Sequence, residues 1–155
     1  METDNLEVGK RAETQEAAIV ISHVNRIFPV AGGEFQALAD ICAEIPAGVL
    51  TILKGRSGSG KTTLLNIVGA LDVPTSGSVL IGGQDVCRLS ERARENLRRT
   101  RVGFVFQSVS LIPTMDAFQN VEFSLRLAGV KKGRGERVEE CLKMVGLGNR
   151  MHHMP

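Results

Sequence analysis

The chain has 155 residues, of which 43% are apolar and 23% charged, so it can bury one hydrophobic core, and a second full domain is not expected. Its formal net charge of +2 is too small and too evenly distributed for a nucleic-acid-binding protein, which usually presents a concentrated basic face. We therefore expect a single domain, or most of one, with no nucleic-acid partner.

Residues 1–17 are polar and low in aromatic side chains, which predicts a flexible tail and excludes a secretory signal. No apolar run approaches the roughly 18 residues that span a bilayer. Cys42, Cys87 and Cys141 are too far apart to form a C-x-x-C pair, so their spacing indicates reduced, mostly buried thiols of a cytosolic protein rather than a zinc site or a disulfide framework. Any link to a membrane is expected to pass through a partner.

The first structured region is predicted to be a pair of strands. Ile and Val dominate 18–28, which predicts a strand, 29–34 has the composition of a turn, and 35–45 returns as a second strand. The continuous apolar run 49–54 is typical of a strand that is buried on both faces.

The middle of the chain alternates helices and strands. Apolar residues at helical spacing predict a helix over 61–72, and 76–86 is interpreted as a strand, a turn and a short strand. Ser90 is a candidate cap for a helix that continues through Arg99. The run 102–106 is again typical of a buried strand.

Two helices are predicted near the C-terminus. The first covers 116–130 with Asp116 as its N-cap, and the second covers 136–150 and ends at Gly146 or Gly148. Strands and helices mixed around a strand, glycine loop and helix unit predict an α/β fold with an incomplete central parallel sheet.

The stretch GRSGSGKTT, residues 55–63, matches the pattern G-x-x-x-x-G-K-[ST] of a P-loop. Small residues let successive backbone N–H groups turn toward phosphates, and the following helix directs its positive dipole end at the same anion. Lys61 supplies charge to the β and γ phosphates, and Thr62 offers a hydroxyl to Mg²⁺. The expected nucleotide contacts are Gly55, Ser57, Gly58, Ser59, Gly60, Lys61, Thr62 and Thr63.

The surrounding sequence resembles the nucleotide-binding domains of ABC transporters. The resemblance covers about residues 19–155 and is carried by GRSGSGKTTLLNIVGALDVPTSGSVLIGGQDV, VGFVFQSVSLIPTMDAFQNV and VGLGNRMHHMP. It is strongest to the subgroup of lipoprotein-releasing and macrolide-efflux ATPases. The PTSG turn and the FQ-x-x-x-L-x-P segment are more specific to that family than the P-loop itself.

The resemblance implies roles for two residues outside the glycine loop. Gln107 stands where the family's Q-loop glutamine contacts Mg²⁺ and the attacking water, in a loop that meets the transmembrane subunit. Phe28 stands where the family places an aromatic residue that stacks on adenine, with Phe35 as the competing candidate and core packing as the alternative for both.

The resemblance also implies ATP and Mg²⁺ as cofactors and two protein partners. One partner is an integral-membrane permease, which would hold the chain at the inner face of the cell membrane. The other is a second nucleotide-binding subunit, arranged head to tail. This domain would power export across the membrane or extraction from it.

The sequence departs from the family downstream of Lys61, where no apolar strand ends in the acidic residues that hydrolysis requires. The chain stops at Pro155, before a signature of the LSGGQ type. We therefore expect an incomplete ATPase domain that binds Mg-ATP weakly without turnover and exposes apolar surface. His152 and His153 precede the position of the signature, so they are interpreted as an exposed tail rather than as the switch histidine or a metal site.

A second hypothesis remains open, namely a non-catalytic, nucleotide-responsive module that regulates a complete ATPase or a permease. A P-loop GTPase or a small-molecule kinase is disfavoured, because the sequence has no N-K-x-D base-reading motif.

Overall fold

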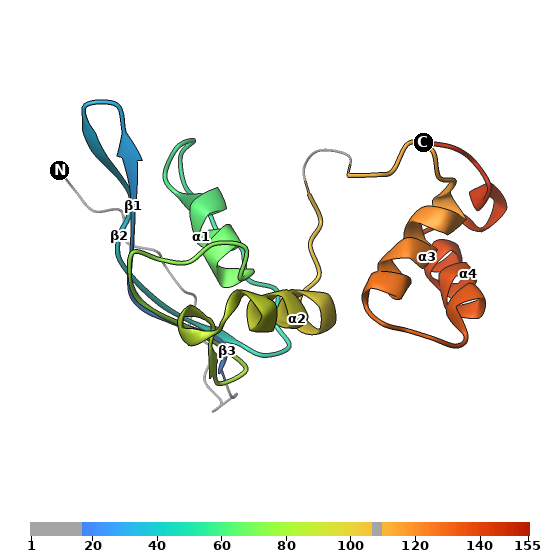
Figure 1. Ribbon diagram of the computed structural model, residues 1–155, viewed down its shortest axis with the longest axis horizontal. Coiled ribbons are helices and arrows are strands. Elements are labelled where there is room, and N and C mark those ends of the chain that lie inside the picture. The colour runs from blue at the N-terminus through green and yellow to red at the C-terminus, as the bar shows by residue number, and fades with distance from the viewer. Residues whose placement is uncertain (1–16, 107–109) are drawn as a thin grey trace. The chain divides into compact units, whose positions relative to one another are not determined.

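The computed structural model describes residues 17–106 and 110–155, which form two compact units (Figure 1). The first unit extends to Arg98 and the second covers 99–155, so the division falls inside the helix Glu91–Arg101. The flexible tail expected over 1–17 lies, except for Ala17, outside the described residues.

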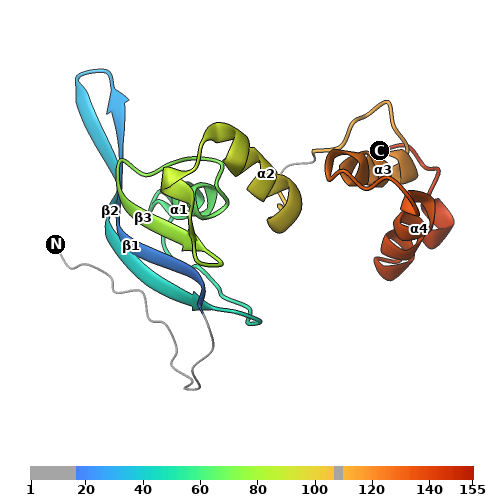
Figure 2. The ribbon, with the colours of Figure 1, turned by 60° about the horizontal axis from the view of Figure 1, so that its bottom comes forward.

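The first unit is built on a sheet of four antiparallel strands in the order β2-β1-β3-β4. Figure 2 shows β1, β2 and β3 beside one another. Two strands of 14 residues form its long hairpin, and two shorter strands complete it. In chain order the strands are β1 Ala17–Val30, β2 Gly33–Pro46, β3 Ser76–Ile81 and β4 Gln84–Asp85.

The hairpin confirms the two predicted strands, both of which extend further into the expected turn. Val30 pairs with Gly33, so only Ala31 and Gly32 connect the strands. A two-residue connection requires left-handed backbone, and Gly32 supplies it with a φ of 92°. The predicted strand, turn and short strand over 76–86 are also confirmed, as β3 and β4.

The core of the first unit lies between the sheet and helix α1, Lys61–Val68, which contacts β2 and β3. Ile67 of α1 is fully buried, as are Val24 of β1 and Val79 of β3. Apolar side chains that leave water in this way stabilise the fold by about 1.5–3 kcal/mol each. This packing fixes the helix that follows the glycine loop against the sheet.

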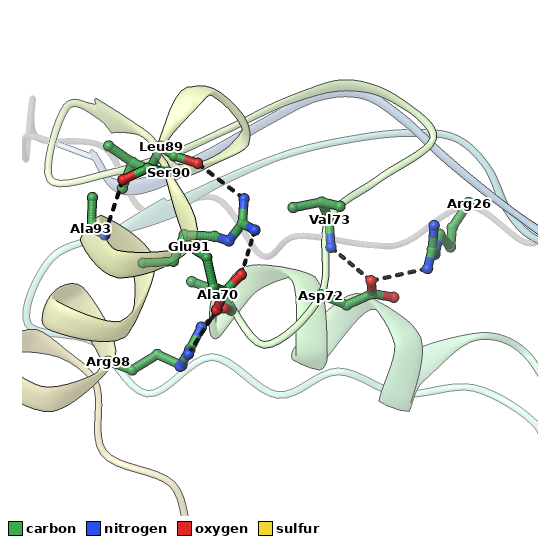
Figure 3. A network of polar contacts seen from close by, with 10 residues as sticks. Arg26, Ala70, Asp72, Val73, Leu89, Ser90, Glu91, Ala93 and Arg98 are labelled. Atoms are coloured by element: carbon green, nitrogen blue, oxygen red, sulfur yellow. Dashed lines mark hydrogen bonds and ion pairs between the residues drawn. The ribbon is translucent and has the colours of Figure 1, made fainter.

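Helix α1 ends at Val68, four residues earlier than the predicted end at residue 72. The reason is Ala70, whose φ of 57° is left-handed and cannot continue the helix. Arg98 holds this turn, because its Nη1 donates to the Ala70 carbonyl at 2.6 Å (Figure 3). Asp72 then binds Arg26 of β1 at 2.9 Å, which connects the turn to the sheet.

Helix α2, Glu91–Arg101, begins as predicted at Ser90, whose Oγ accepts from the Ala93 N–H at 3.3 Å (Figure 3). A short 3-10 helix, Val86–Arg88, precedes it. Glu91 forms ion pairs with Arg94 and Arg98. The hydrogen bond from Arg94, and then the one from Arg98, lower the pKa of Glu91.

The buried strands predicted over 49–54 and 102–106 are wrong, since neither segment is part of a helix or strand. Leu50 is 88% exposed, and Val105 is fully exposed. A strand buried on both faces needs hydrogen-bonded neighbours and covering helices. Among residues 17–106 and 110–155 no strand pairs with either segment, so the expected apolar surface is present.

The second unit pairs helix α3, Ala117–Leu127, with helix α4, Arg134–Met144, and a 3-10 helix, Gly148–Arg150, follows (Figure 1). Both helices were predicted, but α4 starts two residues earlier than residue 136. It stops before Gly146, one of the two predicted end points, which takes a left-handed φ of 77°. None of the helices among the described residues is long and apolar enough to cross a membrane.

The N-cap prediction for α3 is confirmed. The Asp116 carboxylate accepts from the Gln119 N–H at 2.7 Å, and the Gln119 side chain accepts from the Asp116 N–H at 2.9 Å. His152 lies 3.0 Å from the same carboxylate, and its ring stacks near Phe118. His152 therefore supports the helix cap, although its side chain is exposed.

We expect Asp116→Asn to reduce the loss of stability in acid. The Gln119 N–H, and then His152, lower the pKa of Asp116, so its stabilisation is complete above the unfolded pKa of about 3.9. That stabilisation is lost as the pH falls through the lower folded pKa. Asn still caps the helix, so melting followed by circular dichroism should match at pH 7. An equal decline of both proteins below about pH 4 would contradict the assignment.

Candidate functional site

The glycine loop connects segment 49–54, which is part of no helix or strand, to helix α1. Its turn is closed by a hydrogen bond from the Ser59 N–H to the Arg56 carbonyl at 3.3 Å. Gly58 and Gly60 have φ values of 79° and 86°, a left-handed backbone that side chains rarely allow. The sequence thus forms a compact loop immediately before a helix, as the motif predicts.

Gly60 presses the loop against strand β2. A Cβ atom at this position would lie 2.4 Å from the Ala37 carbonyl oxygen and 2.8 Å from Cδ2 of Leu38. Leu38 is itself buried, so it has little room to move. Only glycine allows this approach, which fixes the loop relative to the sheet.

The N-terminus of helix α1 is arranged to receive an anion. Gly60 is its N-cap, no side chain makes a capping hydrogen bond there, and the first turn contains no acidic residue. The first N–H groups of a helix have no intrahelical partner and lie at the positive end of its dipole. A phosphate is the ligand that satisfies both features.

Lys61 places its ammonium group over the loop. Its Nζ donates to the carbonyl oxygens of Gly55 at 2.8 Å and Arg56 at 2.6 Å, and lies 3.4 Å from Oγ of Ser59. These contacts hold a positive charge beside the helix N-terminus. An ammonium on a flexible stem can move from neutral carbonyls to a phosphate, which binds it more strongly.

A hollow of about 420 Å³ opens beside the loop and combines a cation, hydroxyl groups and an aromatic ring. Its position beside Lys61 and the helix N-terminus suits a triphosphate with a metal ion, because Thr62 adds a hydroxyl of the kind that Mg²⁺ accepts. The residues that line it are Phe35, Ala37, Ser57, Gly58, Gly60, Lys61, Thr62 and Thr63.

Two predicted loop residues lie next to this hollow rather than on its lining. The carbonyl of Gly55 and the Oγ of Ser59 both contact the Lys61 ammonium. They therefore contribute to the position of the charge rather than to the wall of the hollow.

The two candidate aromatic residues are cross-strand neighbours on the hairpin. Phe35 lines the hollow and is 53% exposed, whereas the Phe28 ring lies under the Arg26 guanidinium, 4.5 Å from its centroid. The structure thus brings Phe35, the competing candidate, to the hollow. Gln107 lies outside the described residues.

A glycine loop that carries Lys61 and leads into an uncapped helix defines a P-loop NTPase fold. The family model described as ABC transporter matches residues 38–155, and the chain therefore belongs to the ABC transporter family. The match includes the whole glycine loop, the part of the first unit from residue 38 onward and all of the second unit.

Similar proteins include ATP-binding proteins and export proteins. An uncharacterized ABC transporter ATP-binding protein of Thermotoga maritima is 44% identical over 131 residues, or 84% of this chain and 56% of that protein. Another uncharacterized ABC transporter ATP-binding protein, YknY of Bacillus subtilis, is 39% identical over 88% of this chain and 60% of its own length. The macrolide export ATP-binding/permease protein MacB of Salmonella typhimurium is 40% identical, over 90% of this chain and 22% of its own length.

A solved structure shares the fold. It is the ATP-binding cassette MJ0796, in a dimeric post-hydrolysis state bound to ADP and Pi, with a TM-score of 0.81 and 36% identity. The match covers 88% of this chain and 61% of that one. The chain thus spans about three fifths of the length of this cassette and of the two ATP-binding proteins named above.

Proposed function

We propose that this chain is an ATP-binding component of an ABC complex that powers export or extraction of the lipoprotein-release or macrolide-efflux type. The observation that supports it most is the Lys61 ammonium, held beside an uncapped helix N-terminus at the edge of the hollow. The similarity to a protein described as a macrolide export ATP-binding/permease protein supports the choice of system.

In this proposal different residues in and near the hollow bind different parts of the nucleotide. The backbone of 57–60 and the first turn of α1 hold the phosphates, and Lys61 contributes charge to the β and γ phosphates. Thr62, with Gln107 as a second ligand, would hold Mg²⁺, which neutralises phosphate charge. Phe28 remains the proposed base-stacking residue by family position, and Phe35 is the alternative by its place on the hollow.

The proposed partners are a membrane permease and a second nucleotide-binding subunit. A similar cassette is described as dimeric and a similar protein as an ATP-binding/permease protein, which supports both. Binding to the permease would place the chain at the inner face of the cell membrane. The 155 residues alone are proposed to bind Mg-ATP without turnover, since no acidic strand follows Lys61 in them.

We expect Lys61→Ala to weaken ATP binding by about tenfold to hundredfold, because a charge-assisted hydrogen bond contributes roughly 1.5–3 kcal/mol. Isothermal titration with ATP and Mg²⁺ measures the effect. Lys54→Ala is the matched control, since Lys54 lies directly before the loop but does not line the hollow. Equal affinities of the two variants would contradict nucleotide binding at this site.

The same variant tests the absence of turnover. Phosphate release by the purified chain should remain at the level of a blank. Steady-state release that disappears in Lys61→Ala would overturn this part of the proposal, while leaving the binding site itself supported.

A further inference from the structure

Three side chains of different chemistry meet on the exposed surface of the β1–β2 hairpin. His23 comes from β1, and Asp40 and Cys42 come from β2. The prediction of mostly buried thiols is wrong, since Cys42 is exposed and the other two cysteines are half-buried. Nδ1 of His23 lies 2.8 Å from Oδ1 of Asp40, and the His23 N–H donates to Sγ of Cys42 at 3.2 Å. One ligand atom from each residue lies within 4.8 Å of the other two.

Two β-bulges bring the three residues together. Between the pairs Ile21–Ala43 and Val24–Ile41, two residues of β1, the second of them His23, face Cys42 alone. Between Val24–Ile41 and Arg26–Leu38, two residues of β2 face one of β1, and Asp40 is one of the two. Bulges redirect side chains and bend strands, and they are frequent beside functional sites.

The bulges leave both His23 and Asp40 with a φ of 50°. This left-handed conformation costs free energy in most residues, although His and Asp are among those that adopt it more readily. A regular strand pairing would have placed the two side chains differently, because successive residues alternate between the faces of a sheet.

One side chain, Asn25, fixes the backbone of both residues. Its Oδ1 accepts from the Asp40 N–H at 2.9 Å, and its Nδ2 donates to the His23 carbonyl at 3.1 Å. The same amide also donates to Oγ of Ser76 on β3 at 3.2 Å, which ties it to the neighbouring strand. The backbone of His23 and Asp40 is therefore held in place before any metal binds. Hydrogen bonds that orient metal ligands in this way strengthen metal binding.

We propose that His23, Asp40 and Cys42 bind one Zn²⁺ ion, with the fourth position open to water. Zn²⁺ takes imidazole nitrogen, thiolate sulfur and carboxylate oxygen at about 2.0–2.3 Å, whereas Mg²⁺ and Ca²⁺ select oxygen ligands. His23 and Asp40 are 77% and 71% exposed, so their side chains can separate to the spacing of tetrahedral ligands. None of the three lines the hollow at the glycine loop, so the proposed metal site shares no residue with the candidate nucleotide site.

The test is a titration of the full chain with Zn²⁺ in competition with a chromophoric chelator. We expect one equivalent to bind. We expect at least about tenfold weaker Zn²⁺ binding in each of three variants, Cys42→Ser, His23→Asn and Asp40→Asn. Loss of a residue that only hydrogen-bonds to a metal ligand already weakens metal binding by about tenfold or more, and these three are the proposed ligands themselves. Asn is tolerated in left-handed backbone, so the last two variants keep the bulges.

Matched controls use the other thiols and histidines. Cys87→Ser, Cys141→Ser and the double variant His152→Ala/His153→Ala should bind as the original chain does, as should Lys61→Ala. Replacement of Zn²⁺ by Co²⁺ should give a thiolate charge-transfer absorption that Cys42→Ser abolishes and Cys87→Ser keeps.

Saturating Zn²⁺ should also raise the melting temperature of the original chain but not of Cys42→Ser, because a ligand stabilises the state that binds it. The proposal is overturned if no equivalent binds, or if Cys42→Ser and Cys87→Ser retain the same Zn²⁺ affinity.

Discussion

Replacement of Gly60 by Ala should abolish measurable ATP binding and destabilise the first unit. The added Cβ would meet the Ala37 carbonyl oxygen at 2.4 Å and Cδ2 of Leu38 at 2.8 Å. The φ of 86° adds strain for any side chain. Together the clash and the strain should cost about 2–6 kcal/mol, from typical values of about 1–3 kcal/mol for each.

The loss of binding follows from the position of Gly60 between loop and helix. It is the N-cap of α1, so a displacement of its backbone moves the first N–H groups of the helix and Lys61 with them. Relief of the clash requires the loop to move away from β2, which opens the hollow at its base. Donors that are displaced in this way no longer converge on one phosphate.

Gly58→Ala is the matched control, since Gly58 lies in the same loop with a similar φ of 79° but has no atom within 4 Å of an added Cβ. This variant should show only the strain, about 1–2 kcal/mol in urea denaturation, and keep more ATP binding. If the two variants lose equal stability, the close approach of Gly60 to β2 is not what holds the loop.

Local signals in the sequence predicted most of the elements that carry the candidate site. The glycine motif specified the loop and the start of α1, and Ser90 and Asp116 specified helix caps, because capping depends on residues only a few positions apart. The hairpin followed from a run rich in Ile and Val, a second run with partly alternating apolar residues, and a glycine-containing turn between them.

Features that depend on distant neighbours could not be predicted in the same way. The apolar runs 49–54 and 102–106 have the composition of buried strands, but a strand forms only where another strand pairs with it. Their composition indicates that they would be stable in a buried sheet. It does not indicate whether the described residues include a strand that pairs with them.

Neither the spacing of the cysteines nor the adjacent pair His152 and His153 points to the His23, Asp40 and Cys42 cluster. Cross-strand ligands have no fixed spacing, and in this hairpin two register shifts decide which residues meet. A paired-strand alignment that allows bulges at His23 and Asp40 would have found the cluster. The position of Phe35 on the hollow could not be predicted for a related reason. The geometry of the hairpin, and not the local sequence, determines which aromatic ring faces the loop.

Gly77→Ala is the second substitution with a large expected effect, and it acts on the sheet. Gly77, on β3, has a φ of 91°, and its added Cβ would lie 2.3 Å from the His23 carbonyl oxygen and 2.6 Å from that of Ser22. The bulge of β1 cannot easily yield, because Asn25 already holds the His23 carbonyl. We expect a loss of about 2–6 kcal/mol in urea denaturation, from the same two contributions as at Gly60.

Gly83→Ala serves as the control, because its φ of 78° is similar and no atom lies within 4 Å of the added Cβ. It should lose only about 1–2 kcal/mol. Because Gly77 contacts the backbone of His23 but does not line the hollow, Gly77→Ala should weaken Zn²⁺ binding and spare ATP binding in the fraction that stays folded. Gly60→Ala should show the opposite pattern. Parallel losses of both ligands in both variants would mean that the first unit responds as a whole, and that neither glycine acts through its own site.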